Sequence, residues 1–326
     1  MKDTDYLSIS ARIRSMENRL LTAERRERMI DAATDDEALK IIAECGYDQP
    51  EGPSTQAVDA ALTKARLELF ADLKKAVAQP GLVEVFEIKY DYHNAKVLLK
   101  AAAMGEDAGH LLMRGGRYPT QAVTEAVTKD AWGELSPVFQ AAVYAAREAL
   151  EANDPQRSDV ILDKACCGEM AQAAQDSGSR FLEGYVRLSV DAINLRTAVR
   201  CARMGVEPAR LEASLIPGGD VSTQELARGT DVAQAFKNSP LAQAAEAGSA
   251  VAAPGSGSLT EFERLCDNAL TGYLAQAKRV PFGEQPVVGY LCAREAEATT
   301  VRTILALRGA GLSGDAIRER LRDSYV

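Results

Sequence analysis

The chain has 326 residues, of which 46% are hydrophobic, 26% charged and 6% aromatic, which is enough apolar material for one large core or two to three smaller ones. Its 38 Lys and Arg residues against 47 Asp and Glu leave a formal net charge of −9. This excess of acid argues against binding dominated by nucleic-acid phosphates and against docking on anionic lipid by charge. We therefore expect no nucleic-acid partner.

The chain also lacks the usual signals for export and for membrane insertion. Its opening residues, Met1 to Asp5, are mostly polar or charged and do not provide the apolar centre of a secretory signal. Nowhere do about 18 apolar residues follow one another, as a membrane-spanning helix requires. The sequence predicts a soluble protein with no direct membrane insertion.

Metal and thiol chemistry have little support in the sequence. No two cysteines have the CxxC spacing, and the two histidines, His93 and His110, have no thiol cluster near them. We expect no metal site, no cofactor, and reduced thiols that pack in the interior of a cytosolic protein. The six cysteines are Cys45, Cys166, Cys167, Cys201, Cys266 and Cys292.

The fold class predicted from residue patterns is all-α. The chain is rich in alanine, its β-branched runs are short, and helix start and stop signals recur throughout. Thr34, Ser222 and Ser258 each open a capping box with a Glu three residues later, and Ser136-Pro137 also starts a helix. The predicted long helices, with shorter ones between them, cover residues 6–32, 35–44, 55–79, 82–104, 137–152, 180–204, 259–278 and 286–308. The Gly-Ser-Gly-Ser stretch at 255–258 is the best candidate for an internal boundary.

A polar pattern on three of these helices forms an internal repeat. The second copy lies 100 residues after the first, and the third copy is weaker. The copies are Asp91, Asn94 and Lys96; Asp191, Asn194 and Arg196; and Glu297, Thr300 and Arg302. In all three, a glycine follows 14 residues after the acid, which predicts a helix of about four turns that ends at a left-handed glycine.

The repeat predicts three related helical bundles, which we place at residues 1–119, 120–225 and 226–326. We expect the acids and amides to be buried polar links inside a bundle, and the basic residues to lie nearer a central cavity or the contacts between bundles. The candidate structural or partner-contact residues are therefore Asp91, Asn94, Lys96, Asp191, Asn194, Arg196, Glu297 and Arg302.

The closing part of the chain carries the most specific pattern. It runs from Pro281 through Glu297 to Arg302, Gly311-Leu312 and the final Tyr325-Val326. This pattern, together with Tyr6-Leu7 and Ala11-Arg12-Ile13-Arg14 near the start and the first two copies of the repeat, resembles the C subunit of the vacuolar/archaeal-type (V/A-type) rotary ATPases, the homologue of the eukaryotic d subunit. The resemblance covers essentially the whole chain.

The resemblance implies a three-fold pseudo-symmetric, funnel-shaped protein without catalysis of its own. Such a protein would sit at the cytoplasmic face of the membrane, on the rotor ring of c/K-type subunits. It would receive the D and F subunits of the central stalk in its cavity and pass torque between stalk and ring. The third copy departs from the first two, with Glu297 in place of Asp and Thr300 in place of Asn.

Two other hypotheses remain open from the residues. One is a free all-helical scaffold or adaptor, and the other is an all-α enzyme that uses Cys166 or His93. Usable GxGxxG, GxxxxGK[ST], HExxH and GxSxG motifs are absent, which argues against dinucleotide, P-loop, metalloprotease and hydrolase chemistry. The sequence does not distinguish H⁺ from Na⁺ transport, or ATP synthesis from hydrolysis.

Overall fold

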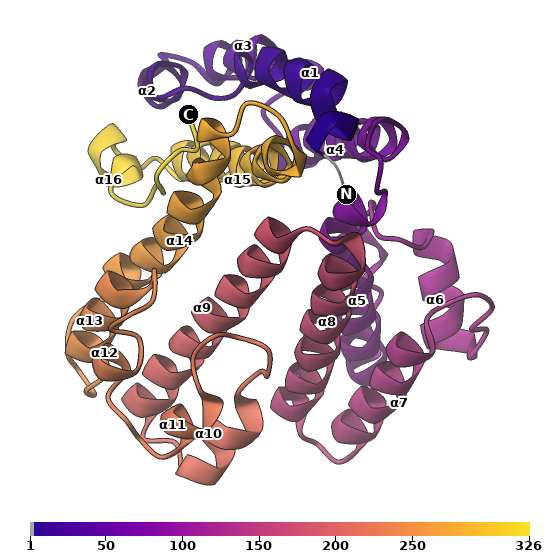
Figure 1. Ribbon diagram of the computed structural model, residues 1–326, viewed down its shortest axis with the longest axis vertical. Helices are drawn as coiled ribbons and strands as arrows, with labels where there is room; N and C mark the ends of the chain where they lie inside the picture. Colours follow the sequence, from indigo (N-terminus) through magenta and orange to yellow (C-terminus); the bar gives the residue numbers. More distant parts are fainter. Residues whose placement is uncertain (1–2) are drawn as a thin grey trace. The chain divides into compact units, whose positions relative to one another are not determined.

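The computed structural model describes residues 3–326, and this part of the chain contains α- and 3-10 helices and no strand (Figure 1). The fold class is therefore all-α, as the residue pattern predicts. The chain divides into two compact units, unit 1 with residues 3–78 and 258–326, and unit 2 with residues 79–257. One boundary falls between Gly257 and Ser258, inside the Gly-Ser stretch expected to contain it.

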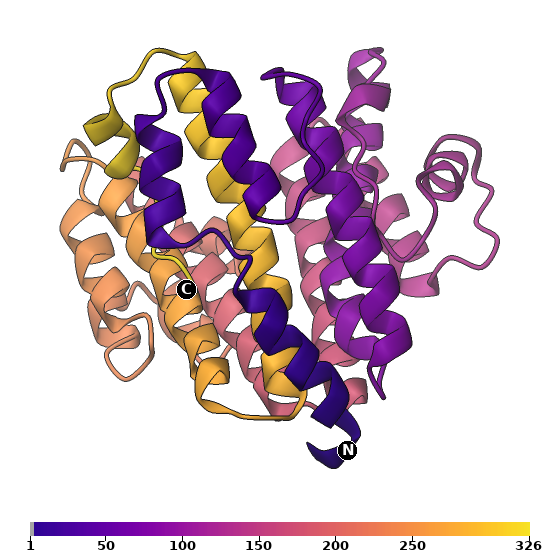
Figure 2. The same cartoon turned by 90° about the horizontal axis from the view of Figure 1, so that it is seen from above.

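Unit 1 combines both ends of the chain. The long helix α15 lies beneath the N-terminal helices α1, α2 and α3, and α14 and α16 also pack on it (Figure 2). The elements of unit 1 are η1 (Asp3–Tyr6), α1 (Leu7–Glu17), α2 (Ala23–Asp31), α3 (Asp35–Glu44), α4 (Thr55–Ala76), α14 (Thr260–Leu274), η3 (Ala275–Arg279), α15 (Glu284–Gly309) and α16 (Gly314–Arg318).

Unit 2 is built around three long helices, in which α8 packs against both α5 and α9. The elements of unit 2 are α5 (Gly81–Met104), η2 (Gly109–Leu111), α6 (Thr120–Lys129), α7 (Pro137–Glu151), α8 (Pro155–Ser177), α9 (Arg180–Met204), α10 (Pro208–Ser214), α11 (Thr223–Ala227), α12 (Val232–Ala235) and α13 (Ala242–Val251).

Two of the three predicted capping boxes start helices as expected. The Thr34 and Ser222 hydroxyls accept hydrogen bonds from the N–H groups of the Glu residues three positions later, at 3.2 and 3.3 Å. The prediction for Ser258 is wrong, because the helix starts later and its N-cap is Leu259. Ser258 Oγ instead accepts the Thr260 N–H.

The predicted single helix over residues 6–32 is also wrong. The structure has two helices here, α1 and α2, and Thr22 is the N-cap of α2. The chain leaves the helical path so that Leu20 and Leu21 are buried, and the Leu21 N–H donates to Glu297. This break depends on a partner far away in the sequence.

Helix α8, with 23 residues, is longer than the short elements expected between residues 152 and 180. Its start signal is present in the sequence, because Asp154 accepts the Arg157 N–H at 2.9 Å and Pro155 occupies the first helical position. The sequence of α8 does not show one clear apolar face, because α5, α7 and α9 all pack against this helix. Its polar positions meet charged residues of α5.

The core between α5, α6, α7 and α8 is centred on Phe139, which has no exposed surface. Its ring lies edge-on to Tyr92, with 5.0 Å between the ring centroids. Tyr118 and Trp132, the only tryptophan in the chain, contact the same ring. Aromatic pairs in these arrangements add to the free energy gained by burying their surface.

Replacing Phe139 by Ala should therefore lower the free energy of unfolding of unit 2 by roughly 3–5 kcal/mol, because the loss of the ring leaves a cavity. Urea unfolding followed by Trp132 fluorescence measures this change. Val138→Ala is the matched control, since Val138 is its neighbour on α7 and is 53% exposed; its effect should stay within about 0.5 kcal/mol. Equal effects of the two substitutions would contradict this description of the core.

Candidate functional site: the loop clasps of the repeat helices

The first repeat helix, α5, holds the loop that follows it through two buried side chains. Asn94 Nδ2 donates to the Met113 carbonyl oxygen, and the Met113 N–H donates back to Asn94 Oδ1, both at 2.8 Å. One turn earlier, Asp91 accepts the N–H groups of Arg117 and Tyr118 at 3.3 and 3.4 Å. We call this arrangement of acid, amide and loop backbone a loop clasp.

The same loop clasp recurs on α9 with the same types of atom. Asn194 Nδ2 donates to the Ile216 carbonyl oxygen at 2.7 Å, and the Ile216 N–H donates to Asn194 Oδ1 at 2.8 Å. Asp191 accepts the N–H groups of Asp220 and Val221 at 3.0 and 3.1 Å. The prediction that the acids and amides are buried holds for both helices, although they link a helix to a loop rather than a helix to a helix.

A pair of glycines lets each loop approach its acid. Gly115 and Gly218 have φ angles of +104° and +103°, in the region that glycine adopts without strain. At the next residue, Gly116 or Gly219, a Cβ atom would overlap with Oδ1 of Asp91 or Asp191. Each loop therefore needs its first glycine for backbone direction and its second for space.

The two clasps differ in charge. In the first, Arg117 Nε donates to Asp91 at 3.0 Å and its Nη2 reaches Glu169 of α8 at 2.9 Å. Glu169 also accepts the hydroxyl groups of Tyr92 and Ser136, each at 2.7 Å. Burial acts to raise the pKa of Glu169, but these hydrogen bonds outweigh it and lower the pKa.

In the second clasp, Asp220 takes the place that Arg117 has in the first. Its carboxylate pairs with Arg187 of α9 at 2.9 Å. Burial raises the pKa of Asp191, and the charge of Asp220 adds to this shift. In the first clasp, burial raises the pKa of Asp91 to about 6, although the hydrogen bond and charge of Arg117 act to lower it. The pKa values of the Asp91 and Asp191 carboxyls both lie above their ordinary range.

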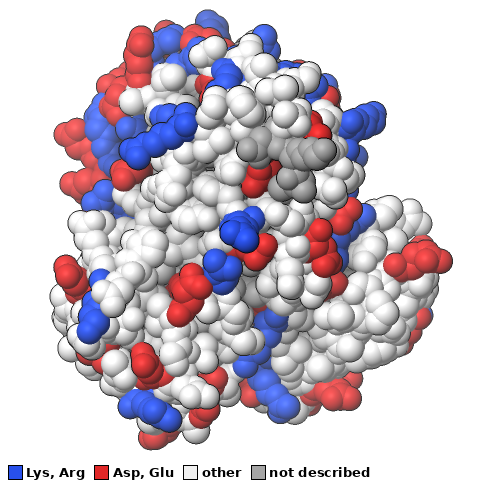
Figure 3. Space-filling view, in the orientation of Figure 1, with Lys and Arg blue, Asp and Glu red and all other residues white. Residues whose placement is uncertain are grey.

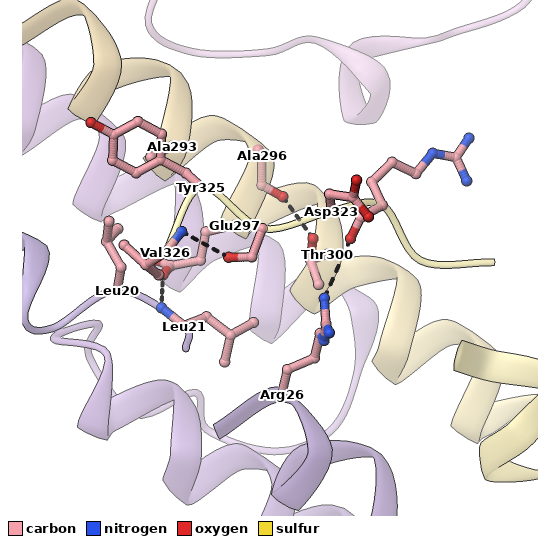
Figure 4. Close-up of a pocket in the computed structure, with 12 residues that line it drawn as sticks. Leu20, Leu21, Arg26, Ala293, Ala296, Glu297, Thr300, Asp323, Tyr325 and Val326 are labelled. Carbon is pink, nitrogen blue, oxygen red and sulfur yellow. Dashed lines mark hydrogen bonds between the residues drawn. The ribbon is translucent and has the colours of Figure 1, made fainter. Parts of the chain in front are cut away.

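The third acid, Glu297, holds a segment from the other end of the chain (Figure 4). In unit 1 it accepts the Leu21 N–H and the Tyr47 hydroxyl, the latter at 2.6 Å, and it pairs with Arg294 at 2.6 Å. Burial raises the pKa of Glu297. Thr300 does not hold a loop as Asn94 and Asn194 do, because its hydroxyl donates to the Ala296 carbonyl oxygen of its own helix.

The three basic residues of the repeat are only partly buried. Lys96 pairs with Asp163 of α8 at 2.6 Å, and Arg302 pairs with Asp59 of α4. Arg196 is half-buried on α9. Each of these side chains lies on the flank of its helix, and their predicted role beside a cavity or at contacts between bundles stays a prediction.

The residues considered for catalysis are poorly suited to it. All six cysteines are buried thiols, and burial raises the pKa of Cys167 to about 11 and that of Cys166 further, which disfavours the reactive thiolate. His93 Nε2 lies 3.2 Å from the Leu111 carbonyl oxygen. Among the described residues, no group of three or more His, Cys, Asp or Glu side chains could hold a metal ion, and no helix is long and apolar enough to cross a membrane.

Several residues of the clasps were not identified from the sequence. Met113 and Ile216 contribute only backbone atoms, so their side chains carry no signal for this contact. The paired glycines did carry a signal, since they are 103 residues apart while the acids are 100 apart, which indicates equivalent loops of different length. The second copy has no residues equivalent to Arg117 and Glu169. Comparing the copies of the repeat therefore does not identify these two residues.

Gly116→Ala should destabilise unit 2 by about 2 kcal/mol, because the new methyl group pushes the loop away from Asp91 and overpacks the site. Thermal or urea unfolding measures the change. The matched control is Gly168→Ala in the middle of α8, where a Cβ meets no other atom within 4 Å and should stabilise the helix by roughly 0.5–1 kcal/mol. A stabilising effect at Gly116 would contradict the described clasp.

The pKa of Asp91 predicts a dependence of stability on pH. A carboxyl with a pKa of about 6 when folded, and the ordinary 3.8 when unfolded, binds more protons in the folded state between these values. The stabilisation that this group contributes is fully present below about pH 4 and is lost as the pH rises through 6. Lowering the pH from 7 to 5 should therefore raise the free energy of unfolding of the wild-type protein by about 1 kcal/mol through this group. Asp91→Asn should remove that gain in urea unfolding at the two pH values, and an unchanged gain would contradict the shifted pKa.

The chain is similar over most of its length to rotary ATPase components of bacteria and archaea. It is 24% identical to the C subunit of the V-type sodium ATPase of Enterococcus hirae over 339 residues, which cover 98% of this chain and 99% of the relative. It is 27% identical to the C subunit of an A-type ATP synthase of Halorubrum lacusprofundi over 260 residues, 74% of this chain and 73% of the relative. The C subunit of a V-type ATP synthase of Thermus thermophilus is 28% identical over 228 residues, 66% of this chain and 68% of the relative.

The family model described as ATP synthase (C/AC39) subunit matches residues 9–320. This range includes both loop clasps of unit 2, the buried Glu297 and most of the closing pattern. The match therefore agrees with the resemblance inferred from the sequence. The chain belongs to the ATP synthase C/AC39 subunit family.

Proposed function

We propose that this chain is a non-catalytic central-stalk subunit of a V/A-type rotary ATPase. It acts as a socket that joins the D and F subunits of the stalk to the membrane rotor ring, and it transmits torque during coupled ATP synthesis or hydrolysis and ion transport. In this role it is peripheral, at the cytoplasmic face of the membrane. The observation that carries the proposal is the family match over residues 9–320 of a chain whose helices repeat one loop clasp.

The loop clasps support a mechanical role. A joint under torque must resist deformation, and each clasp ties a loop to a long helix through four or more hydrogen bonds made by a buried Asp and a buried Asn side chain. A buried polar group that loses its partner costs free energy, so such a connection opens rarely. The loops are thereby held in one position relative to α5 and α9.

The surface of unit 2 supports partners held by polar contacts over a wide area. In Figure 3, acidic and basic side chains are interspersed over the lower half of the drawn face, where α10 and α11 lie. A surface of mixed charge suits an interface of on the order of 1,000 Å² or more with a polar rim. Within the proposal, bundles at residues 1–119, 120–225 and 226–326 surround the cavity that receives the stalk.

The test is binding of the purified D–F stalk pair to the purified chain at micromolar concentration and moderate salt. The triple variant Lys96→Glu, Arg196→Glu and Arg302→Glu reverses the repeat cations and should weaken stalk binding at least tenfold. The control variant Lys40→Glu, Lys129→Glu and Lys237→Glu makes the same change in net charge at exposed residues and should change binding less than twofold.

Melting temperatures of both variants show whether the folded state survives. No binding of the stalk by the unmodified chain would overturn the socket and favour the free scaffold. Equal losses in the two triple variants would remove the special role of the repeat cations and leave only a general effect of charge.

A further inference from the structure

Two methionines at equivalent places in the repeat are the most exposed large hydrophobic residues in the described part of the chain. Met104 is the last residue of α5 and is 65% exposed, and Met204 is the last residue of α9 and is 67% exposed. A second apolar residue follows seven positions later in each copy. Leu111 is 53% exposed, and Leu211 is half-buried.

Both methionines lie at one end of unit 2. Helix α5 is antiparallel to α8, because Lys96 and Lys100 of α5 pair with Asp163 and Asp159 of α8 at 2.6 and 2.8 Å. Helix α9 packs on α8 and follows it after a two-residue turn at Gly178, so it too is antiparallel to α8. The C-terminal ends of α5 and α9 therefore lie at the same end of unit 2 as the start of α8 (Figure 1).

Neither methionine is needed to end its helix. The glycine that follows each one, Gly105 or Gly205, has a left-handed φ of +70° or +64°, and its N–H bonds back to the last turn. A polar side chain would fill the methionine position equally well in an isolated protein. Two separate helices nevertheless expose a large apolar side chain at the same repeat position.

The third repeat helix does not share this feature. Its residue at the methionine position is Ala310, and the residue that corresponds to Leu111 and Leu211 is Ile317. Ile317 is buried in the core that it forms with residues of α2 and α3 in unit 1. The third copy of these positions is thus covered within unit 1, whereas Met104 and Met204 stay exposed in the two copies of unit 2.

We propose that the methionine tips, defined as Met104 with Leu111 and Met204 with Leu211, are the surface by which this chain contacts the loops of the membrane rotor ring. The inference rests on the proposed function and extends it to a named surface. A ring of identical subunits presents the same loop several times, so two equivalent tips can each meet an equivalent loop.

The chemistry of the tips favours a protein over a bilayer. Glu106 and Asp107 follow Met104, and Glu207 follows Met204, all at exposed positions. Two basic residues beside the second tip have partners within the chain: Arg203 donates to the carbonyl oxygens of Val251 and Gly257, and Arg210 donates to Gln156 Oε1 at 2.6 Å. Acidic neighbours oppose an anionic lipid surface, whereas flexible methionines adapt to apolar side chains on a protein loop.

The test compares binding of variants to the detergent-solubilised rotor ring and, separately, to the D–F stalk pair. Met104→Glu with Met204→Glu should weaken ring binding at least tenfold and change stalk binding less than twofold. The matched control is Val138→Glu with Ala141→Glu on the exposed face of α7 in the same unit, which should leave both affinities within twofold of wild type. Circular dichroism and melting temperature confirm that all variants are folded.

A photoreactive p-benzoylphenylalanine at position 104 or 204 gives a second measurement in the assembled complex. Crosslinks from both positions to the ring protein, with none from position 138, are the expected result. Ring binding unaffected by the double substitution, or crosslinks from the tips to the stalk, would overturn the inference and leave the socket intact. Failure of the unmodified chain to bind both ring and stalk would instead overturn the proposed function.

Discussion

The buried carboxylate that accepts backbone N–H groups of the following loop is the interaction on which the rest of unit 2 depends. Asp91 and Asp191 lie on the long helices α5 and α9, and each loop reaches its acid only because a glycine leaves room for the oxygen. The amide three residues later adds two hydrogen bonds to the same loop. The loop path is thus set by the helix before it.

Unit 1 meets the same requirement with different residues. Glu297, one methylene longer than Asp, reaches the Leu21 N–H and the Tyr47 hydroxyl, so the segment that it holds comes from the start of the chain. The N-terminal and C-terminal parts of the sequence therefore form one compact unit. The break between α1 and α2 and the burial of Leu20 and Leu21 follow from this contact.

The sequence was sufficient to predict the fold class, the repeat helices and the burial of their acids and amides. These features depend on local patterns, such as the caps at Thr34 and Ser222 and the glycine that ends each repeat helix of unit 2. Features that depend on distant partners were not predictable in this way. The break between α1 and α2 depends on the contact of Leu21 with Glu297. The hydrogen bonds at Met113 and Ile216 involve only backbone atoms of these residues, so their side-chain types give no signal.

We propose that the clasped loops make this chain stiff enough to pass torque between stalk and ring. The most direct measurement is the number of ions moved per ATP hydrolysed, in vesicles that contain the complete ATPase with either the wild-type chain or the double variant Asp91→Ala and Asp191→Ala. We expect the variant complex to assemble and hydrolyse ATP but to move fewer ions per ATP, because loosened loops let the joint slip. An unchanged ratio in an assembled complex whose clasps are lost would contradict it.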